Sequence, residues 1–330
     1  MKFRLMLLLL VLLCLLGGCA APAGMTVDEP YADLIVVGFS QVGAESDWRN
    51  ANTRSMQQAL SAENGFRLII DDAQQKKERQ ITAIRNFIHQ GVDYIVLAPT
   101  TEDGWDTVLA EAKAANIPVI IIDRMIDSSL TTGDAGAGLF TSWIGSDFQR
   151  QGDAAVRWLE ERFGDTPLQI VHLQGNYGSS AQVGRSASLD KGLQRNPHWT
   201  LAARDSGDFT QAKGQELVEA YLAQGIGFNV IFAENDNMAY GAIAALKNAG
   251  LVPGQDVTIV SFDANRKALE MVAAGEISYD VECNPLHGPR VRAVIEQLER
   301  GEKPARFTFV EETAFSSEGL TPEIINSRGY

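Results

Sequence analysis

Short apolar runs separated by helix-patterned segments repeat along this chain, and the repeat occurs twice. The first series of runs is 34–39, 66–70, 94–98 and 119–122, and the second is 168–173, 201–205, 228–233 and 257–262. Continuous apolar runs of this length fit strands buried on both faces, and their alternation with helices is typical of a parallel sheet covered by helices. The two series are too long for one sheet. We therefore expect an α/β protein of two similar lobes with a cleft between them.

Apolar residues at helical spacing mark the segments between these runs. Examples are Ile81, Ile84 and Ile88, then Val156, Leu159 and Phe163, then Met238, Ala242, Ala245 and Ala249. A last helix is expected from Val291, Val294, Ile295 and Leu298, before an apolar run at 307–310. Residues 127–137, between the two series, are rich in Ser, Thr, Gly and Asp, which predicts a loop.

The first nineteen residues carry the pattern of an exported lipoprotein. Lys2 and Arg4 precede an apolar run, and the small residues Gly17 and Gly18 stand directly before Cys19. We expect a cleaved signal over 1–18, acylation of Cys19 and a flexible stalk over 19–33, with the protein lipid-anchored at the periplasmic or extracellular face. An ordinary secretory signal or an uncleaved anchor helix are the alternatives, but the run is short for a membrane span.

The charge of the chain limits the classes of partner that it can bind, and its cysteine content limits the disulfides that it can form. The chain has 28 Lys and Arg against 42 Asp and Glu, and removing the signal takes away only bases. Such an acidic surface argues against nucleic acid and anionic lipid as main partners. With Cys14 removed in the signal and Cys19 acylated, Cys283 stands alone, so we expect no intramolecular disulfide and a fold held by its core.

Polar side chains gather directly after the predicted strands, where ligands bind in open parallel sheets. They include Gln41, Glu45, Trp48, Arg49, Asp123, Arg124, Asn235, Asp263 and, after the short apolar run 277–281, Glu282. Charged planar groups bind sugar hydroxyls in pairs, and aromatic rings such as Trp48 and Phe209 can stack on the C–H face of a sugar. Structural roles remain open at this point: a strand-end ion pair for Asp123 and Arg124, a helix N-cap for Asn235, and a core position for Trp48.

Six segments carry a family resemblance. They are 37–46 with the following Trp48-Arg49, 90–93, 122–124, 206–210, 235–238 and 261–263. From about residue 34 onward the chain resembles the periplasmic sugar-binding proteins of ABC transporters, in the ribose-binding and lactose-repressor-core superfamily. It is most similar to their galactofuranose-binding type.

The resemblance implies a type I periplasmic-binding-protein fold, in which two Rossmann-like lobes are joined by three crossings. The lobes would be 34–146 plus 284–308 and 147–283 plus 309–330, with the ligand between them. It implies stacking by Trp48 and Phe209, a hydroxyl-gripping pair in Asp123 and Arg124, and a second-lobe arginine at Arg185. The implied ligand-binding set is Gln41, Glu45, Trp48, Arg49, Asp123, Arg124, Arg185, Phe209, Asn235, Asp263 and Glu282. No metal, cofactor or catalytic residue is implied.

Other functional classes fit the sequence less well. We find no phosphate loop at a helix start, no nucleophile elbow and no metal-ligand spacing among the four histidines. Asp123 and Asp263 could form a glycosidase pair, but the positive charge of adjacent Arg124 favours an ionised carboxylate over a proton-donating acid. A repressor would carry DNA-binding helices where this chain has an export pattern. A sensor for a membrane kinase or chemoreceptor remains the alternative to a monomeric partner of an ABC permease and its ATPase.

Overall fold

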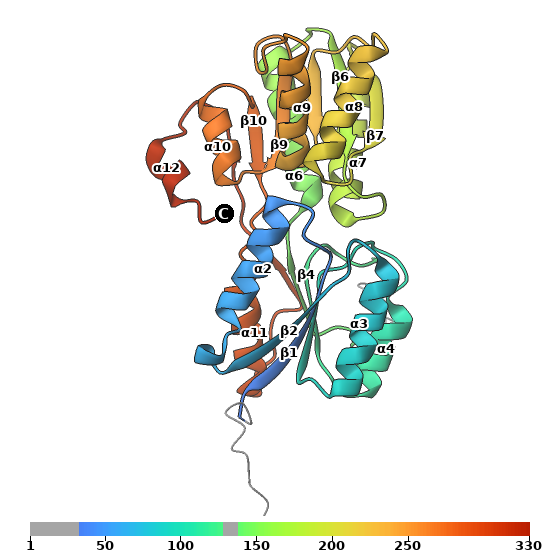
Figure 1. Ribbon diagram of the computed structural model, residues 1–330, viewed down its shortest axis with the longest axis vertical. Coiled ribbons are helices and arrows are strands. Elements are labelled where there is room, and N and C mark those ends of the chain that lie inside the picture. Colours follow the sequence, from blue (N-terminus) through green and yellow to red (C-terminus); the bar gives the residue numbers. More distant parts are fainter. Residues whose placement is uncertain (1–32, 128–137) are drawn as a thin grey trace, which may run out of the picture. The chain divides into compact units, whose positions relative to one another are not determined.

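The computed structural model describes residues 33–127 and 138–330, and Ile35–Tyr330 form one compact unit (Figure 1). The predicted signal, Cys19, nearly all of the predicted stalk and nearly all of the predicted loop at 127–137 lie outside the described residues. The compact unit contains two six-stranded sheets with helices packed on them. The prediction of two α/β lobes is therefore confirmed.

The first sheet is parallel throughout, in the order β11-β5-β4-β3-β1-β2. Its strands are β1 (Ile35–Gln41), β2 (Phe66–Asp72), β3 (Tyr94–Leu97), β4 (Val119–Asp123), β5 (Ser142–Gly145) and β11 (Phe307–Phe309). Because β2 and β3 lie on opposite sides of β1, the connections that follow β1 and β3 diverge. This leaves a crevice at the carboxyl ends of the strands.

Helices flank both faces of this sheet. Helix α2 (Asp47–Ala59) packs with α11 (Gly288–Glu299), and α3 (Lys77–Gln90) packs with α4 (Asp106–Ala114) on the opposite face (Figure 1). A 3-10 helix, η1 (Ala62–Asn64), leads from α2 to β2. In β4, Ile120 and Ile122 join the core beneath α2 and α11, whereas Ile121 joins the core beneath α3 and α4. Alternating side chains of a strand reach both faces, which explains the unbroken apolar run.

The second sheet repeats this topology in the order β12-β10-β9-β8-β6-β7, and only β12 is antiparallel to its neighbour. Its strands are β6 (Leu168–Gln174), β7 (Trp199–Ser206), β8 (Val230–Ala233), β9 (Thr258–Asp263), β10 (Tyr279–Glu282) and β12 (Ala314–Phe315). The two series of apolar runs in the sequence therefore correspond to two sheets of the same topology.

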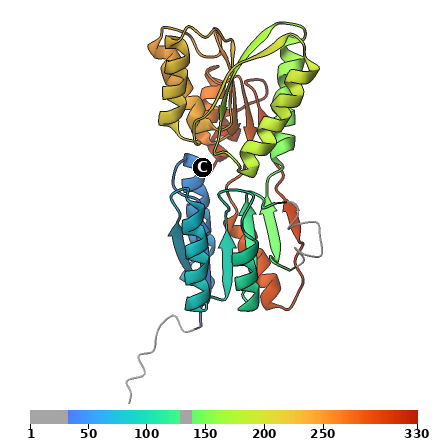
Figure 2. The same ribbon diagram turned by 90° about the vertical axis from the view of Figure 1, so that its right-hand side faces the viewer.

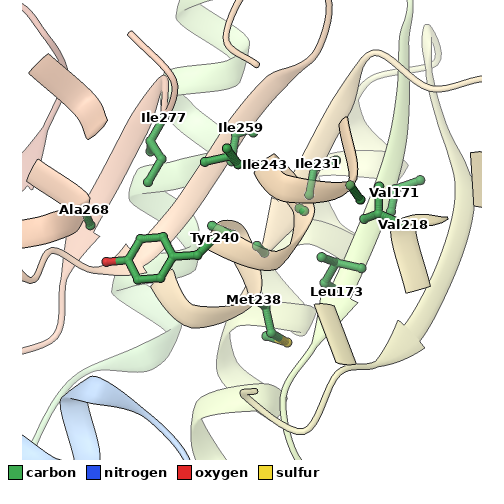
Figure 3. Close-up of a cluster of buried hydrophobic side chains, with 14 of the residues drawn as sticks. Val171, Leu173, Val218, Ile231, Met238, Tyr240, Ile243, Ile259, Ala268 and Ile277 are labelled. Atoms are coloured by element: carbon green, nitrogen blue, oxygen red, sulfur yellow. The ribbon is translucent and has the colours of Figure 1, made fainter. Parts of the chain in front are cut away.

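Helix α9 (Asp236–Asn248) is the most deeply buried helix of the second lobe. Its Met238 and Ile243 lie over the sheet near Leu173 and Ile231 (Figure 3). On its other side α8 (Gln211–Ala223) approaches so closely that a Cβ at Gly241 would stand 2.1 Å from the backbone oxygen of Gln211. The remaining helices form two pairs. Helix α6 (Phe148–Phe163) packs with α7 (Ser180–Arg195), and α10 (Arg266–Ala273) packs with α12 (Pro322–Ser327).

Three short segments of the described chain connect the sheets. They lie between β5 and α6, between β10 and α11, and between β11 and β12. Figure 2 shows β11, in red, beside β5, in green, where the two strands pair. The late segment of the chain thus belongs to both sheets.

Three strands differ from the predictions. Strands β5 and β12 were not predicted, because neither is a continuous apolar run: β5 begins with Ser142 and ends with Gly145, and β12 has two residues. Strand β7 begins at Trp199, two residues before the predicted run, and its early residues Thr200 and Leu201 are exposed. This is an edge strand, so apolar continuity underestimates its length.

Candidate ligand-binding site

The carboxyl ends of strands from both sheets line one cavity. Its walls are Glu45, Ser46, Trp48, Arg49, Asp123, Arg124, Phe148, Ala181, Arg185, Phe209, Asn235, Asp263 and Cys283. Helix α2 begins beside it, because the Ser46 side chain accepts the backbone N–H of Arg49 and caps the first turn. This cap sets Trp48 and Arg49 at the cavity wall. The free volume is about 30 Å³, which is room for only a few water molecules.

Arg49 is the centre of the charged network in the first lobe. Its Nη1 lies 2.9 Å from Oδ2 of Asp123, and its Nε lies 3.4 Å from Oε1 of Glu45. Gln41 stands behind it and accepts from Nη1 at 3.2 Å. Burial opposes the positive charge, but the carboxylates of Asp123 and Glu45 outweigh it and raise the pKa of Arg49. Arg49 therefore stays charged inside the protein.

Arg124 is less well compensated. Its Nε is 3.9 Å from Asp123 Oδ2, and its Nη1 donates to the backbone oxygen of Thr100 at 3.1 Å. Burial, together with the nearby charge of Arg49, lowers the pKa of Arg124 to about 10. The guanidinium carbon lies 5.2 Å from the centre of the Phe209 ring. This guanidinium has donor capacity that a ligand oxygen can use.

Arg185 is the cationic group that the second lobe contributes to the cavity. Its Nε and Nη2 donate to Oε1 of Gln151 at 3.0 and 2.8 Å, and its Nη1 donates to the backbone oxygen of Glu234. Asp263 Oδ1 is 4.0 Å away, beyond hydrogen-bond distance. Burial and the charge of Asp236 raise the pKa of Asp263 well above its ordinary value. Asp263 can therefore serve as donor or acceptor to a hydroxyl.

Two aromatic side chains complete the walls. Trp48 donates its indole N–H to the backbone oxygen of Cys283 at 2.6 Å, which ties α2 to the segment after β10. Phe209 lies against Gly175, where a Cβ would stand 1.8 Å from its ring. Asn235 holds the same loop by donating to the backbone oxygen of Phe209 at 3.0 Å.

The backbone is strained at three positions of the cavity wall. Asp123, Phe209 and Asp263 have φ values of 63°, 60° and 115°. Such conformations cost energy for residues other than glycine, and they cluster at functional sites because the surrounding structure must hold them in place. Here each one turns a side chain toward the same cavity.

Residues 37–286 match the periplasmic binding protein domain. The chain belongs to this family. The galactofuranose-binding protein YtfQ of Escherichia coli K12 is 35% identical to it over 309 residues, which cover 92% of this chain and 94% of YtfQ. The match confirms the resemblance stated above. Members of the family work outside the cytoplasm, and YtfQ is by its name a binding protein rather than an enzyme.

Two solved structures share the fold. One, from Mycobacterium smegmatis in complex with β-D-fucofuranose, has a TM-score of 0.80 and 38% identity, covering 86% of this chain and 91% of its own. The other is the arabinose ABC transporter component from Shewanella sp. ANA-3, bound to α- and β-L-arabinofuranose. It has a TM-score of 0.81 and 37% identity, covering 89% and 95%. They confirm the type I fold.

The structure brings most of the predicted ligand-binding residues to the cavity of this periplasmic binding protein. Nine line it: Glu45, Trp48, Arg49, Asp123, Arg124, Arg185, Phe209, Asn235 and Asp263. Gln41 supports Arg49 from behind. Two of the structural alternatives are present as well: Asn235 N-caps α9, and Trp48 packs with the second-lobe core. The nearer partner of Asp123 is Arg49, not the predicted Arg124.

Glu282 lies outside this cavity wall. Its carboxylate accepts from Arg328 and, at 3.0 Å, from the hydroxyl of Tyr330, so it binds the carboxyl-terminal segment. The sequence position of Glu282, after a short apolar run, gives no sign of these hydrogen bonds to Arg328 and Tyr330. The neighbouring Cys283 lines the cavity instead, as do Ser46, Phe148 and Ala181, which were not predicted. Phe148 was missed because β5, which precedes it, was missed.

Within residues 33–127 and 138–330, no group of three His, Cys, Asp or Glu side chains is placed to hold a metal ion. Over the same residues, no helix has both the length and the hydropathy needed to cross a membrane.

Proposed function

We propose that this periplasmic binding protein captures a monosaccharide in the cavity and delivers it to an ABC permease and its ATPase. The observation that carries the proposal is the alternation of three buried arginines with carboxylates around one cavity flanked by Trp48 and Phe209. Such groups grip adjacent hydroxyls with charge-assisted hydrogen bonds, and the rings cover the apolar face of the sugar.

The relatives favour a five-membered sugar ring. YtfQ is named for galactofuranose, and the two solved complexes contain fucofuranose and arabinofuranose. Each of these three proteins is at least 35% identical to this chain. We therefore propose a furanose as the ligand. One of the three relatives is a component of an ABC transporter, which favours import over sensing.

Entry of a sugar requires the cavity to open, because the charged and aromatic side chains that line it are buried. We propose that the lobes, with the borders given above, separate about the three connecting segments. Opening would break the contacts between Asp47 and Asn237, between Met125 and Ser180, and between Gln75 and Asn176. A ligand that contacts both lobes then shifts the population toward the closed form, which the permease recognises.

The remaining features follow from this role. We propose that the signal over 1–18 exports the protein, that acylated Cys19 anchors it as a monomer, and that the sugar is released unchanged. The Cys19→Ala variant should be exported and recovered as soluble, binding-competent protein. Retention of that variant in membranes would place the anchor elsewhere.

A thermal-shift panel tests the proposed ligand class. Furanose-forming sugars should raise the melting temperature, because a ligand that binds only the folded state stabilises it by mass action. Methyl pyranosides of the same sugars, which cannot form the five-membered ring, serve as the matched control. A panel in which no sugar shifts the melting temperature would reject the proposal, and a shift by the pyranosides alone would reject the furanose.

A further inference from the structure

A carboxylate in one of the three segments that connect the sheets hydrogen-bonds to the other two. Glu312 lies in the segment between β11 and β12. Its Oε1 accepts from the hydroxyl of Ser146 at 2.6 Å and from the backbone N–H of Asn284 at 2.8 Å. Ser146 directly follows β5, and Asn284 follows β10. The three segments are therefore hydrogen-bonded to one another through Glu312.

The second oxygen of Glu312 is connected to the cavity wall through Gln151. Its Oε2 accepts from Nε2 of Gln151 at 2.6 Å, and the same Nε2 donates to the backbone oxygen of Glu282 at 3.1 Å. These two acceptors fix the orientation of the Gln151 amide, so its Oε1 faces Arg185. A reversed amide would place its NH₂ group against the guanidinium, where it has nothing to accept its hydrogens.

Arg185 depends on this arrangement for its position. Its N–H groups are bound by Gln151 and by the backbone oxygen of Glu234, while the Asp263 carboxylate stays 4.0 Å away. Gln151 is 3% exposed and Arg185 is 2% exposed, so water cannot replace a lost partner without local rearrangement.

We infer that Glu312 is a positioning residue: through Gln151 it holds the Arg185 guanidinium at the cavity wall, and it couples that guanidinium to the three connecting segments. Glu312 does not line the cavity itself. The consequence for sugar affinity rests on the proposed function, but the consequence for the position of Arg185 does not.

The test uses a polarity swap in the full chain. Glu312→Gln keeps the shape but places an amide against Gln151, and Gln151→Glu places two carboxylates together. In the double variant, the amide introduced at position 312 can donate to a carboxylate at position 151 that also accepts from Arg185. Glu311→Gln is the matched control, because Glu311 is the exposed neighbour on the same segment.

Two measurements are made on each variant: sugar affinity by calorimetry, and the arginine Nε–H signals of the ligand-free protein by ¹⁵N-edited NMR. The Arg185 signal is assigned by its loss in Arg185→Lys. We expect each single swap to lower affinity by about tenfold and to shift or broaden the Arg185 signal. The double variant should recover part of the affinity and a sharper signal, because its carboxylate at position 151 still faces the backbone oxygen of Glu282. Glu311→Gln should change neither.

The outcomes separate the two proposals. An Arg185 signal in Glu312→Gln that superimposes on that of the wild type would overturn the positioning role, and so would a double variant no better than the single ones. If wild type and Glu311→Gln bind no sugar, the proposed function fails while the NMR signal still decides the role of Glu312. If a single variant fails to fold, the double variant still provides a test, because regained folding and sugar affinity in the double variant would support the coupling between positions 151 and 312.

Discussion

The Nη1 nitrogen of Arg49 lies 2.9 Å from Oδ2 of Asp123, and neither side chain is more than 5% exposed. This ion pair joins the first turn of α2 to the carboxyl end of β4. Both charged groups line the cavity, so each can turn its remaining hydrogen-bonding capacity toward a ligand.

Asp123→Asn tests this ion pair. Asn keeps the shape and tolerates the left-handed backbone at this position, where φ is 63°. It removes the charge that compensates Arg49 and Arg124, so we expect sugar affinity to fall by about 100-fold while the protein still folds. Calorimetry measures the loss. The control is Asp165→Asn at an exposed loop position. Equal affinities in both variants would contradict the assigned role.

Gly175→Ala tests whether the position of the Phe209 ring at the cavity wall matters for binding. A Cβ at Gly175 would stand 1.8 Å from the Phe209 ring, so the ring must leave its position at the cavity wall. We expect a loss of stability of about 1–3 kcal/mol from overpacking, together with at least tenfold weaker sugar binding. Denaturant unfolding and calorimetry report the two effects. Gly329→Ala, which meets no atom within 4 Å, should change neither. Unimpaired binding by Gly175→Ala would remove Phe209 from the site.

Two substitutions of Trp48 separate its hydrogen bond from its ring. Trp48→Phe loses the bond to the Cys283 oxygen but keeps an aromatic face, so the free energy of unfolding should fall by about 1–2 kcal/mol with a modest change in affinity. Trp48→Ala should also lose most of the sugar affinity. Trp158→Phe, at a ring stacked on Tyr279, is the control for an indole outside the cavity. Equal affinities for Trp48→Phe and Trp48→Ala would argue against stacking.

Glu282→Gln tests the reassigned role of Glu282. Burial opposes its ionisation, but Arg328 and Tyr330 outweigh burial and lower the pKa of Glu282. A lowered pKa in the folded state means stabilisation that is complete above the unfolded pKa of about 4.3 and is lost as pH falls through the folded value. The substitution should therefore cost about 2 kcal/mol of unfolding free energy at pH 7 and less in acid.

The same variant should bind sugar like the wild type. Glu276→Gln, which breaks the exposed pair with Lys247, is the control and should cost under about 1 kcal/mol. If Glu282→Gln instead weakens sugar binding while leaving stability intact, Glu282 is a ligand-binding residue after all.

Much of this architecture could be predicted because parallel α/β sheets leave a strong trace in sequence. Buried strands such as β4 are continuous apolar runs, and Asp123 and Asp263 are the last residues of their strands. That position alone directed both carboxylates toward a common cavity.

What could not be predicted depends on contacts between distant segments. Strand β12 has two residues and exists through its pairing with β10. The pairing of Asp123 with Arg49 requires knowing that α2 begins next to β4, and the position of Glu282 requires knowing where Arg328 ends up. Gln151 and Glu312 carry no local signal, because an amide and a carboxylate on surface-patterned segments read as solvated residues.

Isothermal titration calorimetry of the wild-type protein with galactofuranose, arabinofuranose and fucofuranose decides whether the cavity captures a furanose. We expect at least one of these sugars to bind with one site per chain and to be recovered chemically unchanged after the titration. The absence of binding heat for all three sugars, or recovery of a converted product, would show that the protein is not a furanose carrier.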